Sequence, residues 1–161
     1  RLTEVNDQYL PNYRLTEGAS DAIKDSENKS LIDDSRLWME MARAVNKGEG
    51  FKETMEEVLK TKGVSQENMA SKMGVTRSSY AKWIGSDRIS LKHVVAICVG
   101  LKLRYDISMK LIELSGNRLG TSDLHGLYRT FLLEPLIDVP RCNEILKKCR
   151  YPALTEGKDD E

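Results

Sequence analysis

Residues 64–83 decide the fold, and they read Val-Ser-Gln-Glu-Asn-Met-Ala-Ser-Lys-Met-Gly-Val-Thr-Arg-Ser-Ser-Tyr-Ala-Lys-Trp. Ser65 and Thr76 are good N-cap residues, each placed just before a short segment with helical apolar spacing. We therefore expect one helix over 66–73 and a second over 77–84, joined by a tight turn in which Gly74 takes a positive φ. The apolar and small residues that face inward in this arrangement are Met69, Ala70, Met73, Val75, Tyr80 and Trp83.

Similar patterns on both sides predict more helices. Ahead of the turn, a helix that ends at Gly63 carries one apolar face, made of Phe51, Met55, Val58 and Leu59. C-terminal to the turn, a helix that begins after Ser90 carries an apolar stripe made of Leu91, Val94, Val95, Cys98 and Leu101. Later helices are expected over 107–114, 123–133 and 141–148.

The N-terminal part is less regular. Residues 1–32 keep neither a period of 2 nor one of 3.6, so we expect an extended or disordered arm. A linking helix is expected over 33–48, with Leu37, Met41 and Val45 at four-residue steps and Gly48 at its end. The predicted organisation is an arm (1–32), a linking helix (33–48), a central helical domain (49–104), a C-terminal helical extension (105–154) and an acidic tail (155–161).

The layout of residues 51–104 is a helix-turn-helix pattern, and it resembles the phage-repressor-like (XRE) family. The Ser65-Gln66 start, the Gly74-Val75-Thr76 turn and the helices on either side fall at that family's spacing. One departure is that Ile84 and Leu59 stand where members often bury a Glu–Arg pair. Because an apolar pair can replace a buried ion pair at little cost, we expect the two side chains to be buried together. The resemblance implies an all-α, phage-repressor-like helix-turn-helix bundle with additional C-terminal helices and a flexible N-terminal arm.

The resemblance also implies a function, sequence-specific binding of double-stranded DNA by a transcriptional regulator. In this family the second helix of the motif, here 76–84, enters the major groove. Arg77 is the best candidate for reading a base, because a guanidinium bonds O6 and N7 of guanine together. The expected DNA-binding residues are Gln66, Lys72, Thr76, Arg77, Ser78, Ser79, Lys82 and Arg88.

The charge distribution agrees with a nucleic-acid partner although the 161-residue chain is neutral overall. Residues 50–119 carry 12 positive and 7 negative side chains, whereas both flanking segments have a net negative charge. It is the local surface, rather than the total, that meets a phosphate backbone.

Other classes of function have little support in the sequence. The chain has no nucleophile-elbow, phosphate-loop or paired-carboxylate motif, so we expect no enzymatic activity and no cofactor. Three cysteines without a CxxC pair, and two distant histidines, predict neither a metal site nor a disulfide framework. No run of about 20 apolar residues is present, and we expect a cytoplasmic protein that does not bind membranes.

Two alternative functions and one question of assembly remain open. The chain could be a helix-turn-helix domain that binds protein, or the DNA-targeting module of a larger enzyme whose catalytic part precedes Arg1. A homodimer is expected because one short recognition helix reads only a few base pairs. Its candidate interface, which could equally pack within one chain, is Leu124, Leu127, Tyr128, Phe131, Leu132, Leu136 and Ile137.

Overall fold

The computed structural model describes residues 29, 31–43, 47 and 49–156, and the chain forms two units, Arg1–Ser35 and Arg36–Glu161. In the first unit, the described residues are helical, including Leu31 and Ile32. The helix therefore begins before Asp33, because aliphatic residues with no Gly or Pro among them extend a helix readily. The rest of the predicted arm lies outside the described residues, as do Val45 and Gly48 of the predicted linking helix.

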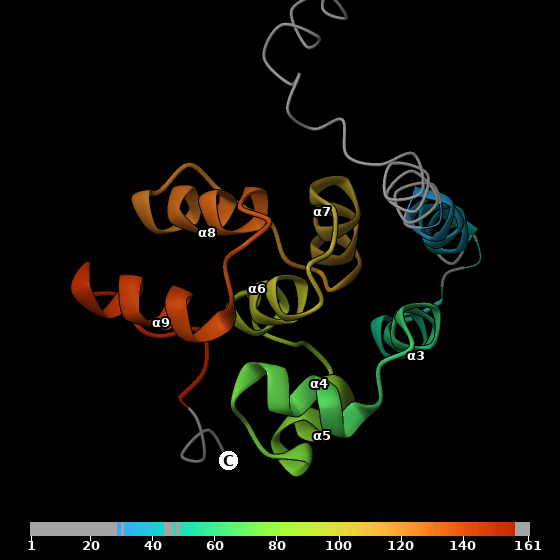
Figure 1. The fold of residues 1–161 in the computed structure, drawn as a ribbon, viewed down its shortest axis with the longest axis horizontal. Coiled ribbons are helices and arrows are strands. Elements are labelled where there is room, and N and C mark those ends of the chain that lie inside the picture. The colour runs from blue at the N-terminus through green and yellow to red at the C-terminus, as the bar shows by residue number, and fades with distance from the viewer. Residues whose placement is uncertain (1–28, 30, 44–46, 48, 157–161) are drawn as a thin grey trace, which may run out of the picture. The chain divides into compact units, whose positions relative to one another are not determined.

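The second unit is helical throughout its described part, which contains no strand, and this confirms the predicted all-α class. Residues 36–43 are helical, and the later helices are α3 (Phe51–Lys62), α4 (Gln66–Met73), α5 (Arg77–Gly85), α6 (Leu91–Gly100), α7 (Tyr105–Leu114), α8 (Asp123–Leu133) and α9 (Val139–Lys148). Figure 1 shows their arrangement.

Helices α7 and α9 each begin two residues earlier than the sequence predicted. At α9, the Asp138 side chain caps the helix by accepting a hydrogen bond of 2.9 Å from the backbone N–H of Arg141. Pro140 then falls in the first turn, where its missing N–H costs nothing. Pro140 therefore lies within α9, just ahead of the predicted start at residue 141.

Helix α6 lies at the centre of the second unit, where it contacts α4, α7, α8 and α9 (Figure 1). All six residues from Val94 to Val99 are buried, so this helix is apolar on every side rather than along one stripe. Near its end it passes close to α4, since a Cβ added to Gly100 would lie 3.0 Å from Cε of Met69.

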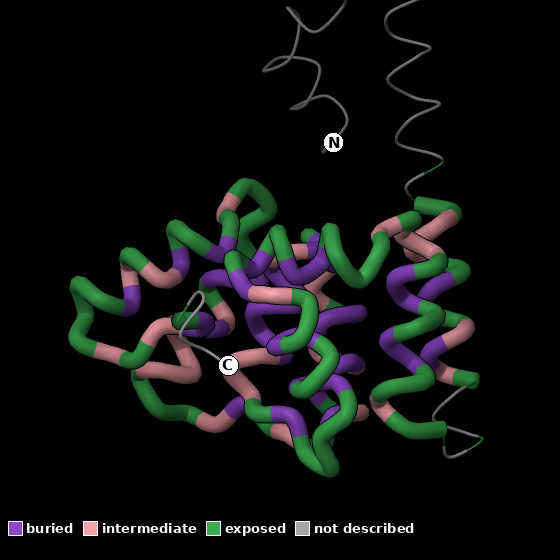
Figure 2. The backbone as a smooth tube through the Cα atoms, turned by 90° about the horizontal axis from the view of Figure 1, so that it is seen from below, coloured by how far each residue is buried: buried purple, intermediate pink, exposed green. Residues whose placement is uncertain are grey.

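One cluster of buried side chains extends from Leu37 and Met41 to Leu154, and Figure 2 shows the buried positions on the inner sides of the helices. It contains Leu59 and Ile84, which confirms their predicted burial together. The sequence-based limits at 48/49 and 104/105 therefore cut through a shared core. The C-terminal helices are part of the packing that supports the helix-turn-helix.

The chain after α9 belongs to this core too. Thr155 is buried, and its hydroxyl donates to the carbonyl of Met73 at 2.9 Å. That carbonyl ends α4 and has no partner within its own helix. Asn143 of α9 holds the segment in place, since its Oδ1 accepts from the Leu154 N–H at 2.8 Å. The predicted acidic tail, 155–161, therefore wrongly included Thr155, which belongs to the packed core. Residues 157–161 lie outside the described part.

Candidate nucleic-acid interface

Local hydrogen bonds fix the turn between α4 and α5. Ser65 Oγ accepts from the Asn68 N–H, and Thr76 Oγ1 accepts from the Ser79 N–H, each at 3.1 Å, which confirms both predicted caps. Gly74 has φ +70°, and the Val75 N–H donates to the Ala70 carbonyl at 3.0 Å. This is the glycine C-cap that the sequence predicted. It sets the direction in which α5 leaves the turn.

Helix α5 has a buried side and an exposed polar side. Tyr80, Trp83 and Ile84 are buried, in agreement with the prediction. The exposed side chains are Arg77, Ser78, Ala81 and Lys82. Their spacing of one, four and five residues places them on one face of the helix. Arg77, Ser78 and Lys82 thus lie on the accessible face that the DNA-binding interpretation requires.

The two predicted contacts on α4 are exposed but lie at opposite ends of the helix. Gln66 is the first residue of α4, and Lys72 lies in its last turn. Gln66 immediately precedes Glu67, which pairs with Arg77, so this end of α4 adjoins the start of α5. Gln66 therefore lies at the end of α4 that the Glu67–Arg77 ion pair joins to α5, and Lys72 lies further along the helix.

Ser79 was predicted to contact DNA, and this is wrong. Its side chain is buried, with 1% of the residue exposed, and its hydroxyl accepts a bond of 3.0 Å from Thr76 Oγ1. The cap causes the burial, because it draws the third residue of α5 under Thr76. Thr76 is half-buried, and its Oγ1 lies 3.1 Å from the Ser78 hydroxyl. Because the same atom accepts from the Ser79 N–H, the structure gives Thr76 the role of a cap.

Arg77 forms an ion pair that the sequence did not predict. Its Nη1 lies 3.2 Å from Oε1 of Glu67, and both side chains are exposed. The two residues are ten positions apart, on different helices, so no helical spacing rule links them. One signal was available, since a cation at a helix N-terminus is unfavourable and an acidic residue nearby relieves it.

Lys82 and Arg88 meet at one cavity of about 300 Å³. Trp83 and His93 also line it, and their rings stack at 3.7 Å between centroids. Nη2 of Arg88 donates to the Gly116 carbonyl at 3.3 Å, which fixes the Arg88 side chain against the loop after α7. The structure thus brings two predicted contacts together at the end of α5. His93 also lines this cavity, which the sequence did not indicate.

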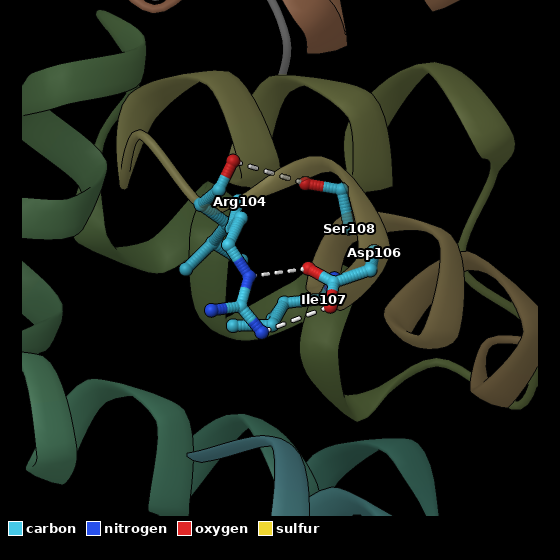
Figure 3. Close-up of polar contacts among 5 residues, drawn as sticks. Arg104, Asp106, Ile107 and Ser108 are labelled. Atoms are coloured by element: carbon cyan, nitrogen blue, oxygen red, sulfur yellow. Dashed lines mark hydrogen bonds and ion pairs between the residues drawn. The ribbon is translucent and has the colours of Figure 1, made fainter. Parts of the chain in front are cut away.

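A second cavity, of about 670 Å³, is lined by Trp38, Tyr105 and other residues of α7 and the loop that follows. Beside it, Arg104 and Asp106 form a two-point ion pair, with Nε–Oδ1 2.7 Å and Nη2–Oδ2 2.9 Å (Figure 3). The hydrogen bond from Arg104 lowers the pKa of Asp106, which also accepts from the Ile107 N–H. Asp106 lies in the first turn of α7, where the helix dipole favours its negative charge.

Both histidines contact neighbouring groups of the fold, and two of the three cysteines are buried. Nδ1 of His125 accepts from the Gly120 N–H at 2.7 Å, and His93 stacks on Trp83. Cys98 and Cys142 are buried, whereas Cys149 is exposed. In the part of the chain that the structure describes, no three His, Cys, Asp or Glu side chains are grouped to hold a metal ion.

Among the described residues, 29, 31–43, 47 and 49–156, no helix is long and apolar enough to cross a membrane. Comparison with protein-family models, with curated proteins and with solved structures gives no match to this chain.

Proposed function

We propose that this chain is a sequence-specific double-stranded DNA-binding protein, a transcriptional regulator similar to the phage-repressor-like (XRE) family, located in the cytoplasm. Helix α5 would enter the major groove with its N-terminal end toward the base edges. The observation that carries the proposal is the exposed face of α5, which presents Arg77, Ser78 and Lys82 while the opposite face is buried.

The chemistry of this face suits a duplex. A major groove admits one α-helix, and arginine, lysine and serine are the side chains that bond base edges and phosphates there. The four predicted cations Lys72, Arg77, Lys82 and Arg88 are all exposed. DNA binding requires such exposed cations to reach the phosphate backbone, whereas the rival interpretation, a helix-turn-helix domain that binds protein, does not depend on them.

The first prediction separates base reading from phosphate binding. Arg77→Ala is expected to cost about 1–3 kcal/mol on the best duplex and to relax the sequence preference, because a bidentate contact to guanine is lost. Lys72→Ala is expected to weaken all duplexes alike and to reduce the salt dependence, because a phosphate contact is lost. Fluorescence anisotropy with a selected and a scrambled duplex, at several salt concentrations, measures both effects.

Ser79→Ala is the matched control, since the Ser79 side chain is buried under the cap. It should leave the ratio of the two affinities unchanged. Equal losses on both duplexes for Arg77→Ala and Lys72→Ala would remove Arg77 from the base-reading role.

We extend the proposal to a homodimer on two half-sites about one helical turn, roughly 34 Å, apart. Of the predicted interface, Tyr128, Phe131 and Leu132 are buried within the chain, so the alternative of internal packing holds for these three. Leu136 of the predicted interface is 87% exposed, and Leu133, which the prediction did not include, is 62% exposed, so these two side chains offer apolar surface for a second copy.

Sedimentation with and without a symmetric duplex tests this assembly, and the expected complex contains two chains per duplex. A strictly one-to-one complex on a site without symmetry would rule out the dimer while leaving DNA binding intact.

A further inference from the structure

The proposed base reader, Arg77, is already paired with a carboxylate before it meets a duplex. Its Nη1 lies 3.2 Å from Glu67 Oε1, and the two side chains are 63% and 72% exposed. A carboxylate repels phosphates and cannot bond O6 or N7 of guanine, which are both acceptors. Taken alone, Glu67 therefore weakens binding to every duplex. The position of Glu67 beside Arg77 is explained if Glu67 increases the selectivity of binding among duplexes of different sequence.

The donors of Arg77 allow it to keep Glu67 and read a base at the same time. A guanidinium has five N–H donors in a fixed plane, of which the bond to Glu67 uses one and a guanine uses two. A guanidinium that is held by a carboxylate also loses less conformational freedom when it binds. The ion pair is thus compatible with base reading and prepares Arg77 for it.

The helix ends explain why the restraint acts on this arginine. Arg77 is the first residue of α5, where the helix dipole repels a positive charge. Glu67 lies in the first turn of α4, where the dipole favours a negative charge. Without Glu67, the guanidinium would turn away from its own helix end toward the nearest negative group, which in a complex is a phosphate.

We propose that Glu67 is a positioning residue that makes Arg77 selective, by holding its guanidinium toward the base edges and withholding it from phosphates. The inference rests on the proposed DNA binding through α5. An exposed ion pair contributes little to folding stability, so a purely structural role would leave the choice among duplexes unchanged.

The test compares Glu67→Gln with Glu113→Gln. Glu113 is a matched control because it is 71% exposed and pairs with Lys110 at 3.3 Å on α7, so its substitution removes the same charge elsewhere. Each variant and the wild type are titrated with the best duplex from a random pool and with a scrambled duplex of the same composition, over a range of salt.

Glu67→Gln is expected to bind the scrambled duplex about 5-fold to 10-fold more tightly at low salt, because one repulsive charge is gone. The slope of log affinity against log salt should steepen by about one, because Arg77 now neutralises a phosphate. The ratio of the two affinities should fall about 5-fold. Glu113→Gln should change neither the slope nor the ratio.

A double-mutant cycle shows whether Glu67 acts through Arg77. In the Arg77→Ala background, Glu67→Gln should leave the ratio of the two affinities unchanged. The inference is overturned if Glu67→Gln matches Glu113→Gln, or if the ratio falls equally in both backgrounds. A wild type that prefers neither duplex would overturn the proposed function together with this inference, so the two failures are distinguishable.

Discussion

Raising the pH from 8 to 11 is expected to destabilise the Arg36–Glu161 unit strongly, because its core contains two buried thiols. Burial raises the pKa of Cys98 from 9.0 to about 12, and burial, with the nearby Asp138 carboxylate, raises that of Cys142 to about 12. In the unfolded chain both thiols lose their protons above pH 9, whereas in the folded chain they keep them.

The folded state therefore binds more protons than the unfolded state above pH 9, and stability falls as the pH rises from there toward 12. Each thiol accounts for a loss of about 3 kcal/mol at pH 11. Burial also raises the pKa of Tyr80 from 10.0 to about 12, which adds about 1 kcal/mol. The sum is comparable with the whole stability of a domain of this size, about 5–15 kcal/mol.

Urea unfolding at a series of pH values, in the presence of a reductant, measures this loss. The double variant Cys98→Ala and Cys142→Ala should show a much flatter pH dependence, although it is less stable at pH 7. Cys149→Ala is the control, because Cys149 is exposed and its substitution should leave the profile unchanged. Identical pH profiles for wild type and the double variant would contradict the account.

Phe131→Ala is expected to destabilise the helix-turn-helix by about 3–5 kcal/mol, although Phe131 lies on α8. The Phe131 residue is 2% exposed and belongs to the same buried cluster as Trp83 of α5. Truncation leaves a cavity in a core that both parts of the unit share. The loss should therefore appear in one cooperative transition rather than in α8 alone.

Trp83 fluorescence reports that transition once Trp38 has been replaced by Phe in all variants. The matched control is Thr130→Ala, next to Phe131 on α8 and exposed, which should change stability by less than about 0.5 kcal/mol. If Trp83 unfolds at an unchanged urea concentration in the Phe131→Ala variant, the C-terminal helices form a separate unit.

The local parts of the fold were readable from the sequence. The caps Ser65 and Thr76, the positive φ of Gly74 and the bounds of α4 and α8 depend on residues within one or two turns, and the structure confirms them. Non-local packing was not readable in the same way. The complete burial of α6 and the bond from Thr155 to Met73 depend on helices that meet only in the folded chain.

The candidate interface divides in the same manner. The spacing of Arg77, Ser78 and Lys82 placed them on an exposed face, because one helical period decides it. The predicted DNA contact of Ser79 was wrong because Thr76, which caps α5, binds the Ser79 hydroxyl and backbone N–H. The Glu67 partner of Arg77 was missed because a contact between two helices leaves no periodic signal.

The most direct test of the central claim, DNA reading by α5, is selection of bound duplexes from a random pool with wild type and Arg77→Ala in parallel. The selection is run at about 50 and about 200 mM salt, because phosphate contacts weaken steeply over that range and base contacts keep their discrimination. We predict that wild type enriches one sequence containing guanine at both salt concentrations and that Arg77→Ala loses the preference for that guanine. A wild-type pool with no enriched sequence at either concentration would contradict the claim.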